Sequence, residues 1–140
     1  MAGNPTPRFV NTVKTYGVNI DSASVKVDIF TAGSDGSKIE YLAITTDDSA
    51  ATSASIFTEN TATTTFEIGF VDVAAGAGTT TGVPTVNGLN STDLPFLSTD
   101  AHSNEFLNIE EGHKLVISAG SLTTGRILTV QAGVRELTSD

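Results

Sequence analysis

The chain contains no cysteine and no tryptophan, and aromatic residues make up only 6% of its 140 residues. Without cysteine there is no disulfide framework, no thiolate metal site and no cysteine nucleophile. Lysine and arginine number only 7 against 16 acidic residues, which gives a net charge of −9. A chain so poor in positive charge is unsuited to wrapping a phosphate backbone, so we expect no nucleic acid partner.

Long apolar runs are also missing. No window of the sequence approaches the roughly 18 apolar residues of a membrane-spanning helix, so we expect no membrane partner. The first residues, MAGNPTPR, lack the basic start and apolar stretch of a signal peptide. We therefore expect a protein that is made and used without passing through a secretory pathway.

Threonine, serine, alanine and glycine fill much of the sequence, and such small or β-branched residues suit strands and tight turns better than long helices. Short alternating segments recur at the spacing typical of a sandwich. The sequence predicts an all-β, single-domain antiparallel β-sandwich of about eight to ten strands, which is jelly-roll-like because closure covers strand edges. We place this domain at residues 9–138 and an extended N-terminal arm at residues 1–8, where prolines are concentrated.

The strongest local pattern runs from Val25 to Asp47 (VKVDIFTAGSDGSKIEYLAITTD). A two-residue period runs through both halves of this segment and places Ile39 and Tyr41 on the same face of the second strand. Between the halves, the glycines of Gly33–Gly36 permit positive φ angles and suit a tight turn. The segment is predicted to form a β-hairpin around which the rest of the chain is organised.

The remaining segments are assigned from the same period. The strand expected at residues 63–73 carries Phe66, Ile68 and Phe70 on one face, and we expect the apolar face of this strand to meet the core. The Gly-, Ala- and Thr-rich interval from Ala74 to Asn90 is predicted to be a long exposed loop with a brief strand at residues 84–86. Other strands are expected at residues 55–58, 105–109, 114–118 and 126–134, with a linker at 16–24 that includes a short strand at 18–20.

Groups that are able to perform catalysis or bind metals are few and lie on turns. His102 and His113 lack a third ligand at the spacing of a zinc site, so we expect solvated histidines. The acidic pairs Asp47–Asp48 and Glu110–Glu111 are expected to face water. No Gly-x-Ser-x-Gly nucleophile elbow is present. We therefore predict a protein that is not an enzyme, with no catalytic residue, no metal and no cofactor.

Several short motifs resemble a known group of proteins. They are Thr6-Pro7-Arg8-Phe9, the run from Ile29 to Ile39 (IFTAGSDGSKI), Ile44-Thr45-Thr46 and, in a looser form, Glu110 to Leu115 (EEGHKL). Together they resemble small β-rich virion proteins encoded in the structural gene clusters of tailed bacteriophages. In the last motif, acids stand where small apolar residues are common in that group.

The resemblance implies a capsid decoration or cement protein, located on the capsid surface of the virion and made in the host cytoplasm. Its partners are expected to be the major capsid protein and itself, as a homotrimer. In this interpretation the arm from Ala2 to Phe9 becomes ordered on docking, with Arg8 pairing an acid of the capsid and Phe9 entering an apolar crevice. The candidate contact residues are Pro5, Pro7, Arg8 and Phe9.

Two other functions remain open from the sequence. The first is a carbohydrate-binding or receptor-binding module of a head or tail fibre, since jelly rolls include lectin domains. The low aromatic content, with only Tyr16 and Tyr41 as tyrosines, weighs against this alternative. The second is a tail or head–tail connector subunit, which is expected to form larger rings than a trimer.

Overall fold

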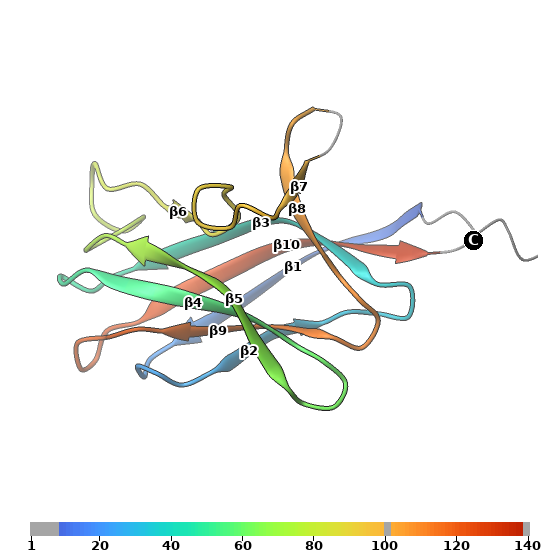
Figure 1. The fold of residues 1–140 in the computed structure, drawn as a ribbon. Coiled ribbons are helices and arrows are strands. Elements are labelled where there is room, and N and C mark those ends of the chain that lie inside the picture. Colours follow the sequence, from blue (N-terminus) through green and yellow to red (C-terminus); the bar gives the residue numbers. More distant parts are fainter. Residues whose placement is uncertain (1–8, 100–101, 139–140) are drawn as a thin grey trace, which may run out of the picture.

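The structure, a computed structural model, describes residues 9–99 and 102–138, and no α-helix occurs in these two ranges. The same ranges contain ten strands (Figure 1). In chain order they are β1 (Phe9–Ile20), β2 (Val27–Thr31), β3 (Ser37–Thr46), β4 (Thr52–Glu59), β5 (Thr65–Val73), β6 (Val86–Asn87), β7 (Ser98–Thr99), β8 (Glu105–Ile109), β9 (Lys114–Ala119) and β10 (Leu128–Thr138). The predicted all-β class and strand number are confirmed. The described residues include no helix that is long and apolar enough to cross a membrane.

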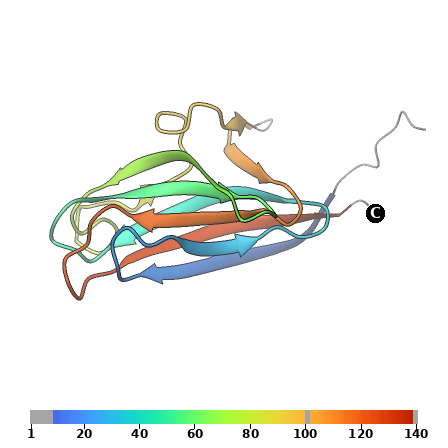
Figure 2. The same cartoon turned by 60° about the horizontal axis from the view of Figure 1, so that its bottom comes forward.

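The strands form two antiparallel sheets. Sheet 1 has the order β1-β10-β3-β8-β7, with β6 also paired to β3, and sheet 2 has the order β2-β9-β4-β5. The two sheets bury an aliphatic core between them. The β7–β8 hairpin projects beyond the body of the sandwich in both views (Figures 1 and 2). Residues of this hairpin form one wall of a cleft.

The strand pairs are nested along the chain, in the order β1 with β10, β2 with β9, β3 with β8 and β4 with β5. The chain is therefore arranged like one long hairpin that closes at the β4–β5 turn. Successive pairs fall alternately in sheet 1 and sheet 2, so the long hairpin is rolled into a sandwich. Eight strands rolled in this order form the double Greek key of a jelly roll, and the predicted fold is confirmed.

The β-hairpin predicted around Gly33–Gly36 is wrong, because β2 and β3 lie in different sheets. The turn between them is a corner that crosses from one sheet to the other. It stacks on the β8–β9 turn, where Ala32 N donates to His113 O at 2.9 Å and Gly112 N donates to Ala32 O at 3.1 Å. In a rolled hairpin each strand pairs with a distant strand, so a good turn sequence does not make its two neighbouring strands partners.

Strand β1 extends into the region that was predicted to be a linker. The short strand expected at residues 18–20 is confirmed, whereas the linker expected at residues 16 and 17 is wrong, because β1 continues to Ile20 and pairs with β10 along its length. The pairing begins with Phe9 opposite Thr138 and ends with Ile20 opposite Leu128. Pairing with a long partner strand keeps residues 16–20 extended where their local pattern is weak. Residues 1–8, the predicted arm, lie outside the described residues.

Strand β5 turns different side chains to the core from those expected. Val71 and Val73 are buried, whereas Phe66 is 53% exposed and Phe70 is 57% exposed. A β-bulge at Ile68 shifts the register with β4 and interrupts the two-residue alternation. The apolar face predicted for this strand is therefore not the face that meets the core.

The Gly-rich interval from Ala74 to Asn90 is not simply an exposed loop. Ala77 and Leu89 are buried in the core cluster. Thr46 N donates to Ala77 O at 2.9 Å, and Gly88 N donates to Leu42 O at 2.7 Å. The interval thus covers the part of the β3 edge that β8 leaves unpaired, and its short strand β6 begins two residues later than predicted.

Candidate functional site

The predicted partner-contact residues fall at the edge of the described structure. Pro5, Pro7 and Arg8 lie outside the described residues, and their role stays a prediction. Phe9 begins β1, and its backbone pairs with Thr138 at the end of β10. Any arm that precedes Phe9 is therefore attached to an outer strand of sheet 1.

Asp48 does not face water as expected. It is 1% exposed, and three donors surround its carboxylate. The backbone N–H of Thr123 donates to Oδ2 at 2.7 Å, while the Thr123 hydroxyl and the N–H of Ala50 donate to Oδ1 at 2.8 and 3.0 Å. Its neighbour Asp47 is exposed, as expected, and accepts from the N–H of Ile127 at 2.9 Å.

These donors stabilise the charged form of the Asp48 carboxylate. The backbone N–H of Thr123 has the largest effect in lowering the pKa of Asp48, followed by the N–H of Ala50 and the Thr123 hydroxyl. The carbonyl of Asp48 also accepts from Gly76 N at 2.8 Å. Asp48 therefore joins the β3–β4 corner to two other loops. With its carboxylate committed to these bonds, its role is structural.

The other predicted titratable groups are arranged as turn residues. Glu110 and Glu111 are exposed, and His113 Nε2 lies 3.6 Å from Glu110 Oε2 within the β8–β9 turn. His102 is exposed at the other end of β8. Among residues 9–99 and 102–138, no group of three or more His, Cys, Asp or Glu side chains is placed to hold a metal ion.

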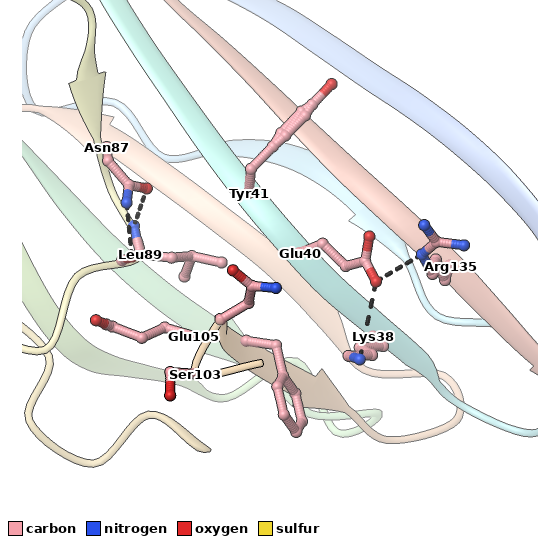
Figure 3. A pocket seen from close by; sticks show the side chains of 10 residues that line it. Lys38, Glu40, Tyr41, Asn87, Leu89, Ser103, Glu105 and Arg135 are labelled. Carbon is pink, nitrogen blue, oxygen red and sulfur yellow. Dashed lines mark hydrogen bonds and ion pairs between the residues drawn. The ribbon is translucent and has the colours of Figure 1, made fainter. Parts of the chain in front are cut away.

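An open cleft of about 690 Å³ lies on the outer surface of sheet 1. It opens where the edge of β3 changes partner, since β8 pairs with residues 37–39 and β6 pairs with residues 43–44. Figure 3 shows the residues of β3 and β10 on one side, and those of β8 and the segment around Asn87 on the other. The cleft is lined by Lys38, Glu40, Tyr41, Asn87, Leu89, Ser103, Asn104, Glu105, Phe106 and Arg135.

A β-bulge builds the floor of the cleft. Tyr41 pairs with Gly133 and Ile39 pairs with Val134, so Glu40 is an extra residue on β3. As a result Ile39 is buried, whereas Glu40 and Tyr41 both point outward. The prediction that Ile39 and Tyr41 lie on the same face of the strand is therefore wrong. No local signal in the sequence marks this bulge.

Both cations of the cleft are already paired. Arg135 Nε lies 2.5 Å from Glu40 Oε1, and Lys38 Nζ lies 3.8 Å from the same oxygen (Figure 3). The Lys38 ammonium also lies 4.4 Å from the centre of the Phe106 ring, a cation–π contact. These contacts hold the charged side chains against the sheet, with the two cations sharing the one carboxylate of Glu40.

One hydrogen-bond acceptor in the cleft, a carboxylate oxygen of Glu105, differs from these paired groups. Glu105 Oε2 is buried and has no hydrogen-bond partner among the described residues. A buried carboxylate oxygen without a donor is costly, and in native structures such a group usually meets a ligand, an ion or a water. Ser103, two residues earlier in the cleft wall, has a φ of 64°, a backbone conformation that is uncommon for a residue other than glycine.

A second surface of interest is strand β5 at the edge of sheet 2. It pairs with β4 only, and it exposes Phe66 and Phe70 by more than half of their surface. The acids Glu67 and Asp72 on the same strand are also exposed. Large aromatic side chains on an edge strand are unusual for a surface that stays in water, and they are typical of interaction sites.

Comparison with known proteins adds no relative: no protein-family model and no curated protein matches this chain.

Proposed function

We propose that this chain is a non-enzymatic virion structural protein that decorates the outer surface of a tailed-bacteriophage capsid. The identity of the partner, the major capsid protein, comes from the resemblance of the sequence motifs. The jelly-roll topology is compatible with the proposal, since this architecture is common among capsid proteins. The low content of charged residues, 16%, also agrees with a role in binding rather than catalysis.

The observation that carries the proposal is the exposed apolar strand β5. An edge strand offers backbone hydrogen-bonding groups to a partner, and Phe66 and Phe70, on opposite faces of β5 because the bulge at Ile68 lies between them, add exposed apolar area on both sides of this edge. A few buried anchor residues carry most of the binding energy at protein interfaces, and aromatic residues, phenylalanine included, are enriched in interface cores. We therefore assign β5 to the surface that contacts the capsid.

Charge favours a different protein, rather than a second copy, as the partner of β5. Two copies joined through this strand bring two Glu67 and two Asp72 side chains into one interface, and like charges there oppose association. The chain as a whole carries a net charge of −9. A capsid subunit with basic groups around an apolar depression is the complementary surface.

The predicted homotrimer then uses other surfaces than β5. A trimer seated on a capsid joins three weak contacts, so the second and third contacts form at high effective concentration. The N-terminal arm, attached at Phe9 to an outer strand of sheet 1, adds a further contact in this proposal. Weak individual contacts suffice because they recur over the whole shell.

Co-sedimentation with capsid shells tests the proposal. Shells are assembled from the major capsid protein encoded in the same gene cluster, mixed with this protein and pelleted. We expect the wild-type chain to pellet with the shells and the Phe70→Ser variant to remain largely in the supernatant. Tyr41→Ser is the matched control, because it removes an exposed aromatic ring from sheet 1, and it should pellet like wild type. Wild-type protein that stays in the supernatant contradicts the proposal.

A further inference from the structure

We propose that the cleft on sheet 1 is a binding site for a neutral saccharide. The proposal concerns a different face of the molecule from β5 and does not depend on the capsid role. A cleft of about 690 Å³ lies within the range of roughly 300–1,000 Å³ that is usual for small-ligand sites. It has room for a short oligosaccharide unit.

The charges of the cleft argue for a neutral ligand. Two cations, Lys38 and Arg135, face two acids, Glu40 and Glu105, so the lining side chains carry no net charge. Both cations are bound to Glu40, at 3.8 Å for Lys38 and 2.5 Å for Arg135. An anionic ligand must compete with Glu40 for these groups, whereas a neutral ligand leaves the ion pairs intact.

The unpartnered oxygen of Glu105 argues for a ligand that donates hydrogen bonds. Glu105 Oε2 is buried in the cleft wall without a donor among the described residues. A rotation of the Glu105 side chain that opens this oxygen to the cleft lets a ligand hydroxyl donate to it, which removes the cost of its desolvation and forms a charge-assisted hydrogen bond. Saccharides carry many hydroxyl donors on one compact ring, and they satisfy such an acceptor without bringing a charge.

Tyr41 supplies the apolar surface that a sugar ring requires. Its side chain is 38% exposed and lines the cleft, and its ring extends from β3 toward β10 in Figure 3. The ring covers Gly133, where a β-carbon would lie only 2.6 Å from Tyr41 Cε2. A ring held against a glycine presents a fixed apolar face, and an aromatic face with a polar tip is well suited to the C–H face and hydroxyls of a sugar.

An array of neutral mono- and oligosaccharides is the first test, followed by titration of the best binder into the wild-type chain and its variants. We expect Tyr41→Ala and Glu105→Ala each to weaken binding about tenfold or more. Glu105→Gln keeps an acceptor oxygen and should lose much less. Phe70→Ala and Glu67→Gln, which change an aromatic residue and a glutamate on sheet 2, are the matched controls and should bind like wild type.

Three results overturn the proposal. The first is the absence of binding to any neutral saccharide both on the array and in saturation-transfer NMR with the wild-type chain. The second is binding that the cleft variants leave unchanged. The third is binding only to ammonium or guanidinium groups of peptides, which Glu105→Gln should abolish. If Tyr41→Ala does not fold, the ligand is titrated into the wild-type chain and amide chemical shifts are measured. The proposal requires that the signals of the cleft residues shift, and it is overturned if they do not. Capsid binding by the cleft variants should be normal, which separates this test from the capsid role.

Discussion

The ring of Tyr41 covers Gly133 on the neighbouring strand, and a β-carbon at Gly133 would lie 2.6–2.8 Å from three of its ring carbons. The two residues are direct cross-strand partners next to the β-bulge at Glu40. The contact explains why a strand interior tolerates a glycine here, since the aromatic ring fills the space above it. It also sets the orientation of the ring that lines the cleft.

Gly133→Ala is expected to displace the Tyr41 ring while the chain still folds. Alanine is favoured over glycine within a strand by roughly 0.5–1 kcal/mol. Loss of the contact with the Tyr41 ring costs a similar amount, about 0.5–1 kcal/mol, and so offsets this gain. We therefore expect a small change in the thermal midpoint together with a clear change in the NMR signals of the Tyr41 ring. Unchanged ring signals are the result that contradicts this account.

Gly69→Ala is expected to destabilise the protein by about 1–3 kcal/mol, the usual cost of overpacking a core. A β-carbon at Gly69 would lie 2.2 Å from Cδ2 of Leu94, which is fully buried. Urea unfolding monitored by circular dichroism measures the effect. Gly17→Ala is the control, because its β-carbon meets its nearest neighbour at an ordinary 3.5 Å, and its stability should stay close to wild type. Equal stability of the two variants contradicts the packing of Leu94 on β5.

Asp48→Asn should lower the thermal midpoint at neutral pH, because an amide has one acceptor oxygen in place of two and turns an NH₂ group toward donors. The hydrogen bonds from Thr123 and Ala50 lower the pKa of Asp48 below its unfolded value. The stabilisation by the Asp48 carboxylate is therefore fully present above about pH 4, the pKa of an aspartate in the unfolded chain. It is lost as the pH falls through the lower pKa that Asp48 has in the folded protein.

Thermal midpoints measured at a series of pH values check this prediction. The difference between wild type and Asp48→Asn should narrow in acid. Asp72→Asn, at an exposed position on β5, should follow the wild-type curve apart from small surface effects. A constant difference between wild type and Asp48→Asn across the acid range contradicts the role of the Asp48 charge.

The purified chain is expected to form a trimer in light scattering at several concentrations. Phe70→Ser should leave the measured mass unchanged, because β5 is assigned to the capsid contact and not to the contact between copies. A chain lacking residues 2–8 should remain folded, since β1 begins at Phe9, but should bind shells more weakly. A ring of much larger mass favours the connector alternative, and a trimer that Phe70→Ser dissociates contradicts the assignment of β5.

The fold class was predictable from the sequence because turn residues and alternating apolar residues are local signals. The strand at Glu105–Ile109 was predicted with its observed bounds, and that at Lys114–Ala119 to within one residue. Which strands pair with one another was not predictable in the same way. The turn at Gly33–Gly36 has the composition of a hairpin, yet it joins two sheets, because the pairing of β2 with β9 and β3 with β8 is decided by contacts distant in the chain.

The candidate sites were harder to predict, and β-bulges are the main reason. One extra residue at Glu40 turns Tyr41 out of the core, and another at Ile68 accompanies the exposure of Phe66 and Phe70. A bulge has no strong local signature, and it reverses the face of every later residue in a two-residue pattern. The sequence alone therefore assigned these side chains to the wrong faces, and neither the cleft nor the exposed strand was foreseen.

Electron cryomicroscopy of capsid shells incubated with this protein is the most direct measurement of its proposed role. The account predicts additional density on the outside of the shell at or near its three-fold positions, with sheet 2 and β5 against the capsid surface. Shells without additional density, or density confined to the portal vertex or the tail, contradict the account.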